Sequence, residues 1–108
     1  MAEEIFRVIF TFSAWEDLEE IAAFWAERGE QERGEQYAQD LPAAAVQRLC
    51  IAGTARQGRH IRNSAYPDVR ELSVFRRSYR ILYRVNEAER IVEVLRFWHS
   101  HRDEPFSD

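Results

Sequence analysis

The stretch DVRELSVFRRSYRILYRVNEAERIVEVLRFW, residues 68–98, decides the fold. It contains three segments rich in β-branched and aromatic residues, at 68–74, 79–86 and 91–98. The two connectors between these segments have the length of hairpin loops. The three segments are therefore predicted to form an antiparallel meander.

A fourth strand is predicted near the beginning of the chain. The run IFRVIFTF, residues 5–12, carries β-branched and aromatic side chains on both faces, which indicates a strand in the interior of a sheet. Two helical segments separate this run from the meander. The first strand must therefore join the sheet through a crossover, with both helices packed on one face.

The first helix is predicted from a capping box and from apolar spacing. Ser13 and Glu16 match the S-x-x-E pattern, and a glycine at position 29 marks the end of the helix near residues 28–29. The apolar side chains at helical spacing are Trp15, Leu18, Ala22 and Trp25.

The second helix is predicted over residues 30–52. Pro42 lies inside it and cannot donate a backbone hydrogen bond, so we expect a kink near residues 38–41 or a division into two shorter helices. Residues 53–67 are predicted to be a loop, and residues 99–108 a polar tail. The fold class is thus α+β, in the order β-α-α-β-β-β, with a helical hairpin on a four-stranded, mainly antiparallel sheet in a single domain, residues 1–108.

Composition excludes several classes of protein. The 108 residues are 45% hydrophobic and 31% charged, which is typical of a globular domain and not of a disordered chain. Cys50 is the single cysteine, so no internal disulfide can form and a reducing compartment is expected. The sequence has no apolar run of membrane-spanning length and no basic signal-peptide start, which favours a cytoplasmic location. No residue spacing is typical of a metal site, and we predict no cofactor or metal.

Charge is distributed unevenly along the chain. The net charge is −4, but residues 1–50 hold 4 Arg and 11 acidic residues, whereas residues 56–84 hold 8 Arg and 2 acidic residues. A basic segment of this kind attracts either nucleic acid or an acidic partner.

The chain resembles the RelE/ParE superfamily of bacterial toxins over nearly its whole length. The resemblance rests on IFRVIFTFSAWEDLEEIAAFW (5–25), the basic loop before VRELSV (69–74), YRILYRV (79–85) and the ending IVEVLRFWHSHRD (91–103). It implies a toxin of a type II toxin–antitoxin system that a cognate antitoxin neutralises in an oligomeric complex. RelE-like members cut mRNA on the ribosome without a metal, whereas ParE-like members poison DNA gyrase.

The resemblance assigns candidate catalytic residues for the RelE-like activity: Arg80, Arg70, His99 and Arg102. Arg80 lies where ribonuclease members carry a catalytic arginine, and Arg70 at the first position of a cationic pair whose second position is Leu72 here. This thinned cationic set and the net acidic charge favour the ParE-like activity, because binding to ribosomal RNA depends on neutralising phosphate charge. Arg80 and Arg84 also alternate with apolar residues, so a role as the solvent face of a strand stays open.

The candidate residues for binding the antitoxin are Trp25, Arg84, Phe97 and Trp98. An antitoxin segment could lay a helix beside the first helix and add a strand to an exposed edge of the sheet. Aromatic anchors are typical of such interfaces, although each of these aromatic residues could instead belong to the core. A third reading is a non-toxic member of the fold that only binds a partner.

Overall fold

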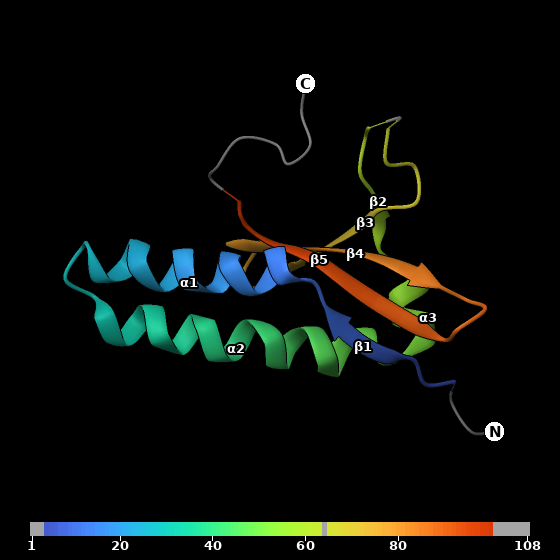
Figure 1. Cartoon of the computed structure of the whole chain (residues 1–108), viewed down its shortest axis with the longest axis horizontal. Helices are drawn as coiled ribbons and strands as arrows, with labels where there is room; N and C mark the ends of the chain where they lie inside the picture. The colour runs from blue at the N-terminus through green and yellow to red at the C-terminus, as the bar shows by residue number, and fades with distance from the viewer. Residues whose placement is uncertain (1–3, 64, 101–108) are drawn as a thin grey trace.

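The computed structural model describes residues 4–63 and 65–100. Helices and strands follow one another along the chain as shown in Figure 1. Their bounds are Arg7–Phe10 for β1, Phe12–Ala26 for α1, Gln31–Leu49 for α2, Ala52–Arg56 for α3, Arg59–His60 for β2, Arg70–Val74 for β3, Tyr79–Asn86 for β4 and Ile91–His99 for β5. The predicted α+β class is confirmed, and the segment predicted as a loop, residues 53–67, contains β2 and all of α3 except its first residue.

The sheet has five strands rather than the predicted four, in the spatial order β1-β5-β4-β3-β2. β1 pairs with β5 in parallel, and the other three pairs are antiparallel. The strand that the helices join directly to β1 is β2, which lies at the opposite edge of the sheet and runs antiparallel to β1. The parallel partner of β1 is the last strand of the meander.

The prediction that the first strand lies in the interior of the sheet is wrong. β1 is four residues long and forms one edge of the sheet. Val8 and Phe10 pack against the core, whereas Ile9 is 37% exposed. The apolar residues on the two faces of β1 therefore have different surroundings. Apolar residues on both faces of this strand do not indicate that both faces are buried.

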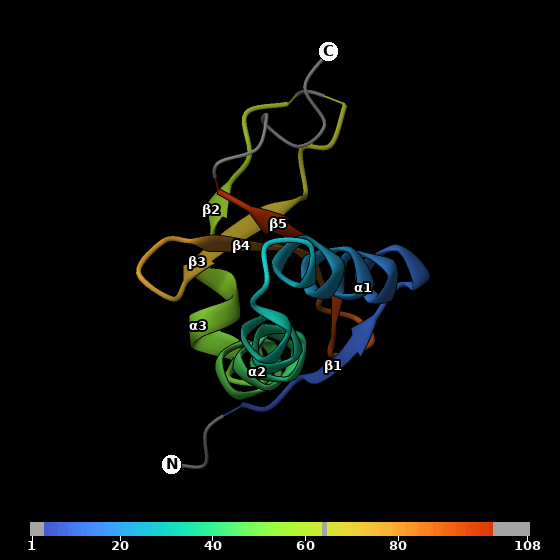
Figure 2. The same cartoon turned by 90° about the vertical axis from the view of Figure 1, so that its left-hand side faces the viewer.

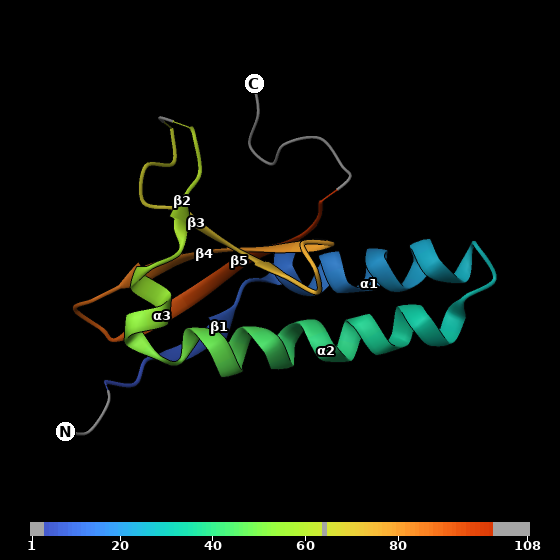
Figure 3. The ribbon, with the colours of Figure 1, turned by 180° about the vertical axis from the view of Figure 1, so that it is seen from behind.

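The core lies between the sheet and the helical pair. Figure 2 looks along α1 and α2 and shows them side by side, and Figure 3 shows from behind how α3 leads the chain from α2 toward β2. The fully buried side chains from these two layers include Leu41, Ala45 and Leu49 on the helix side, and Tyr79, Ile81, Tyr83, Val92, Val94 and Phe97 on the sheet side. No helix of the described residues is both long and apolar enough to cross a membrane.

α1 begins two residues earlier than the capping box predicts. Thr11 is the N-cap, and its hydroxyl accepts a hydrogen bond from the Ala14 amide at 3.1 Å. The same hydroxyl donates to the Leu95 carbonyl of β5 at 2.8 Å. The register between β4 and β5 shifts at Leu82 and Tyr83, which leaves Leu95 as the extra residue of a bulge. Thr11 thus caps the helix and satisfies a bulge carbonyl at once, a role that Ser13 cannot fill.

The buried face of α1 also differs from the prediction. Trp15 is 48% exposed and contacts Phe10, whose ring centroid lies 5.0 Å away. The buried residues of the helix are Ala14, Asp17, Leu18 and Ile21. The apolar spacing therefore predicted the helix correctly, but the face of the helix that is buried is displaced by about one residue from the predicted face.

α2 is a single helix that runs through Pro42 without a break, so the prediction of two shorter helices is wrong. Proline lacks the amide that would donate to the Ala38 carbonyl. Leu41 and Ala45 on either side of it are fully buried, and their packing on the sheet holds the segment helical.

A buried carboxylate joins α1 to β5. Asp17 is 4% exposed and accepts hydrogen bonds from Arg96 Nε at 2.7 Å, from the second Arg96 guanidinium nitrogen at 2.9 Å and from the Phe97 amide at 2.9 Å. The hydrogen bonds to Asp17 and the negative charges of Asp17, Glu20 and Glu16 raise the pKa of Arg96, so the guanidinium stays charged. Asp17 therefore fixes the position of the helix against the last strand.

Candidate functional site

The open face of the sheet is the face turned away from the helices. On β4 the core side chains are Tyr79, Ile81 and Tyr83, so Arg80 and Arg84 point to the open face. On β3, Leu72 and Val74 pack with the core, and Glu71 and Ser73 point to the open face. Of the candidate residues predicted from the sequence, Arg80 and Arg84 lie on this face.

Arg80 is held by an ion pair at the centre of the open face. Its side chain is 10% exposed, and one of its terminal nitrogens lies 3.2 Å from Glu71 Oε2. The other carboxylate oxygen of Glu71 accepts from Arg59, whose Nε lies 2.9 Å away. The alternative that Arg80 is a solvent-facing strand residue is therefore wrong. Its charge is largely buried and is compensated by a carboxylate on the neighbouring strand.

Arg84, farther along β4, is also surrounded by acidic groups. It lies 3.7 Å from an Asp68 carboxylate oxygen and 3.8 Å from Glu93 Oε1, and its side chain is 41% exposed. Ion pairs this long and this exposed contribute little to stability. Together with the Glu71 pairs, they give the open face paired positive and negative charges instead of a continuous basic surface.

A hollow of about 510 Å³ opens beside Glu71. Its lining residues are Gln57, Gly58, Arg59, Glu71, Leu72, Ser73, Arg77 and Arg80. Three arginines thus surround one glutamate, which leaves an excess of positive charge in the hollow. We call this the arginine hollow.

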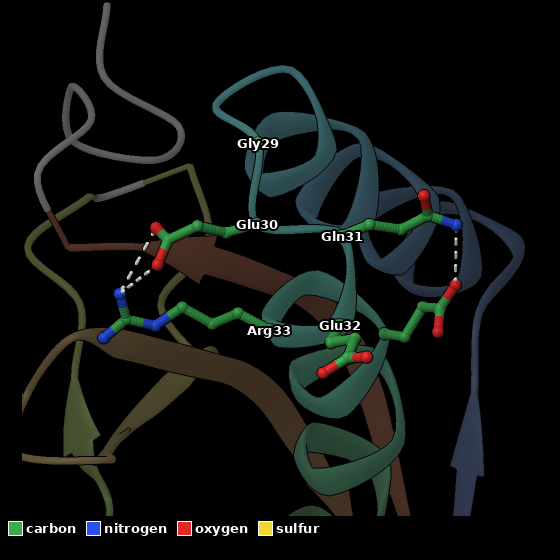
Figure 4. A pocket seen from close by; sticks show the side chains of 6 residues that line it. Gly29, Glu30, Gln31, Glu32 and Arg33 are labelled. Carbon is green, nitrogen blue, oxygen red and sulfur yellow. Dashed lines mark hydrogen bonds and ion pairs between the residues drawn. The ribbon is translucent and has the colours of Figure 1, made fainter.

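The second hollow lies at the turn between α1 and α2 and has a volume of about 710 Å³ (Figure 4). Four of its polar side chains are paired with one another: Arg33 lies 3.3 Å from Glu30, and Gln31 donates to Glu35 at 3.1 Å. It is lined mainly by acidic and amide side chains, with no arrangement of nucleophile and base. We assign it no role.

The predicted catalytic residues do not come together. Arg70 donates to the Gly58 carbonyl at 2.7 Å and lies on the same side of β3 as Leu72. His99 contacts the rings of Phe24 and Tyr79, at centroid distances of 5.6 and 5.0 Å, on the helix side of the sheet. Arg80 is therefore separated from both by the sheet itself. Arg102 lies outside the described residues.

An aromatic cluster fills the end of the core nearest the helical turn. Trp25 donates from its indole nitrogen to the Tyr79 hydroxyl at 2.9 Å, and Tyr37 lies 4.9 Å from the Tyr79 ring. Burial raises the pKa of Tyr79, so its hydroxyl stays neutral at physiological pH. Trp25 is half-buried in this cluster. Its role as an interface residue stays a prediction.

The two predicted aromatic anchors on β5 differ in exposure. Phe97 is 1% exposed and belongs to the core, so its assignment as an exposed anchor is wrong. It faces the helices because β5 alternates sides, and its neighbour Trp98 is half-buried opposite Arg80 on the other face. Arg96 lies over the Trp98 ring at 5.1 Å.

Several of the exposed large apolar side chains of the described residues lie instead around β1 and the start of α1, whereas Val46, Tyr66 and Phe75 are exposed elsewhere. Ile9 is 37% exposed, Phe12 76% and Trp15 48%. The outer edge of β1 has no strand beside it among the described residues. These residues were missed because the first strand was predicted to be interior. Phe12 indicates this surface in the sequence, because it is an apolar residue next to the helix cap that does not fall on the apolar stripe predicted for the first helix.

Comparisons with known proteins bear directly on this arrangement. A family model described as the ParE toxin of the type II toxin–antitoxin system parDE matches residues 8–104. The chain belongs to the ParE toxin family. The predicted membership of the RelE/ParE superfamily is therefore confirmed, and the chain is a toxin of the type II class. No curated protein sequence matches it significantly.

Solved structures share the fold of this ParE-family toxin. A chain of the chromosomal ParDE system from P. aeruginosa is 22% identical, with a TM-score of 0.70 over 89% of this chain and 97% of the other. A chain of the RelBE2 toxin–antitoxin complex from Mycobacterium tuberculosis is 19% identical, with a TM-score of 0.63 over 88% and 98%. The isolated E. coli RelE toxin is 17% identical, with a TM-score of 0.50 over 92% and 88%. Both branches of the superfamily thus share this architecture, and the activity has to be argued from the residues.

Proposed function

We propose that this toxin inhibits DNA gyrase in the cytoplasm and is neutralised by a cognate antitoxin in an oligomeric complex. The observation that carries the proposal is the Arg80–Glu71 ion pair. A ribonuclease of the RelE type has to present cationic groups to the phosphate on which charge develops. In this chain the corresponding arginine is largely buried and its charge is matched by a carboxylate.

The position of the other candidate groups supports the same choice. Cleavage of RNA by attack of a 2′-hydroxyl needs a proton acceptor near the phosphate-binding cations. His99 lies on the helix side of β5, away from Arg80. The ribosome-dependent mRNA endoribonuclease therefore remains the second candidate, and it requires Arg70, Arg80 and His99 to reorganise.

The antitoxin surface proposed here is the edge of β1 with the start of α1. The exposed Ile9, Phe12 and Trp15 offer apolar anchors, and the outer edge of β1 offers backbone hydrogen-bonding groups. Trp25 at the end of α1, Trp98 on β5 and Arg84 on β4 are further candidates. A partner that covers this region removes large apolar side chains from water.

Purified toxin, gyrase and relaxed plasmid test the proposal. We expect loss of supercoiling activity and accumulation of linear plasmid after detergent and protease treatment, which reports a trapped cleavage complex. Primer extension on mRNA translated by purified ribosomes is run in parallel, with Arg80→Ala as the control variant. Cuts in the mRNA that disappear in Arg80→Ala, with gyrase unaffected, establish the ribonuclease instead. Normal growth of bacteria that express the toxin alone points to the non-toxic alternative.

A further inference from the structure

The outer edge of β3 is only partly covered. β2 pairs with Arg70 and Glu71 alone, through His60 and Arg59. The chain preceding Arg59 turns away into α3, so residues 72–74 have a strand on the β4 side but none on the other side among the described residues. An unpaired strand edge of this kind is a template for an added strand.

The arginine hollow opens at this same edge. Leu72 and Ser73 of β3 line it together with the three arginines. Both carboxylate oxygens of Glu71 are engaged, one by Arg59 and the other by Arg80. Within the described part of the chain Arg77 has no carboxylate within ion-pairing distance, so it supplies a cation at the hollow that the fold itself does not neutralise.

The turn that presents Arg77 is unusual. Phe75, Arg76 and Arg77 have φ angles of +53°, +56° and +66°, a left-handed conformation that costs free energy at residues other than glycine. The two arginines follow one another in this turn, but only Arg77 lines the hollow. The turn thus offers two neighbouring arginines in the same backbone conformation, one at the hollow and one outside it.

From these observations we infer that the edge of β3 and the arginine hollow bind an acidic segment in extended conformation. The segment adds a strand beside residues 72–74 and places a carboxylate against Arg77 and the exposed side of Arg59. An acidic peptide fits better than a nucleic acid for two reasons. The free edge provides backbone partners for a strand, and none of the residues lining the hollow is aromatic, so no surface for base stacking is present.

The segment is assigned to the antitoxin, and this assignment rests on the proposed function. The antitoxin would then contact both edges of the sheet, with apolar anchors at β1 and acidic groups at β3. The charge distribution of the chain supports the placing of acidic groups at β3, because the β3 edge lies in the arginine-rich part of a chain that is acidic overall. Acidic residues opposite Arg77 and Arg59 would fix the register of the added strand.

A defined peptide tests the binding chemistry directly. The probe is a fluorescein-labelled decapeptide in which glutamate alternates with valine and threonine, and its control carries glutamine in place of glutamate. We expect the acidic peptide to bind at least about tenfold more tightly than the glutamine peptide, because its several carboxylates meet the exposed Arg59 and Arg77 together. On binding, the amide resonances of residues 72–74 shift in NMR spectra of the labelled toxin.

Two matched variants locate the site. Arg77→Glu is expected to weaken peptide binding at least about tenfold, whereas Arg76→Glu, with the same change of charge in the same turn, changes it by less than about twofold. Circular dichroism and thermal unfolding check that both variants are folded. Equal losses in the two variants overturn the inference, since they indicate diffuse attraction only. Tighter, Arg77-dependent binding of oligouridylate overturns it in favour of nucleic acid.

Growth experiments decide whether the segment belongs to the antitoxin. We expect Arg77→Glu to arrest growth as the wild type does, and to be rescued less well by co-expressed antitoxin. If Arg77→Glu abolishes growth arrest while antitoxin binding is unchanged, the hollow faces the target and the assignment to the antitoxin is wrong. Because the peptide experiment does not depend on toxicity, a toxin that leaves gyrase unaffected refutes the proposed function and leaves the binding inference to be judged separately.

Discussion

Replacing Asp17 by alanine is expected to lower the free energy of unfolding by about 3 kcal/mol, a large part of the margin of a small domain. The variant leaves the buried Phe97 amide without its acceptor and Arg96 without its carboxylate. Both groups lose hydrogen bonds that water replaces only incompletely, because the Asp17 site is almost fully enclosed. Urea denaturation at neutral pH measures the change.

Glu16→Ala is the matched control for this prediction. Glu16 is the preceding residue of α1 and is exposed, so its replacement should change stability by less than about 0.5 kcal/mol. Asp17→Asn should fall between the two, since an amide oxygen still accepts a hydrogen bond but carries no charge. A loss of less than about 1 kcal/mol in Asp17→Ala, below what breaking an enclosed pair costs, means that Asp17 does not fix α1 to β5.

Gly58→Ala should also destabilise the toxin strongly, by about 3 kcal/mol. A Cβ atom at position 58 would lie 1.8 Å from the Tyr83 hydroxyl oxygen. Tyr83 is fully buried, and its hydroxyl donates to the Ala55 carbonyl at 2.7 Å, so the ring has little space into which it could move. Thermal or urea unfolding reports the loss.

Two further variants make this prediction specific. Gly53→Ala adds the same methyl group within α3 where no atom lies within 4 Å, and it should leave stability unchanged or slightly raised. Adding Tyr83→Phe to Gly58→Ala removes the overlapping oxygen, so the double variant should be less destabilised than the sum of the two single ones. If the losses of stability in the two single variants simply add in the double variant, the clash with Tyr83 is not the cause of the destabilisation.

The meander, the crossover and the two long helices could be predicted because each rests on a local pattern. Strand-forming runs, hairpin-length connectors and apolar spacing are properties of short segments. The position of β1 at the edge, by contrast, does not rest on a local pattern. It depends on which strand ends the sheet, and a short run with apolar residues on both sides does not encode that. The N-cap at Thr11 likewise depends on the bulge at Leu95, a residue 84 positions away.

The candidate site shows the same limit. Alternation on β4 correctly placed Arg80 and Arg84 on one face, but the sequence alone did not reveal that Glu71 lies close enough to neutralise Arg80. In the register of β3 and β4, Glu71 lies opposite Leu82 and is diagonal to Arg80, so the ion pair depends on that register. Residues 59 and 71 meet only because β2 returns to the sheet within what was predicted to be a loop. A family resemblance assigns roles to positions, whereas the neutralising partner of each cation appears only in the folded chain.

The state of plasmid DNA in growing bacteria tests the choice of gyrase most directly. The toxin is expressed without antitoxin, plasmid is extracted with detergent and protease soon after induction, and a translated reporter mRNA is mapped from the same cells. We predict linear plasmid and an intact reporter mRNA. Fully supercoiled plasmid together with a reporter mRNA cut within its coding region would contradict the account.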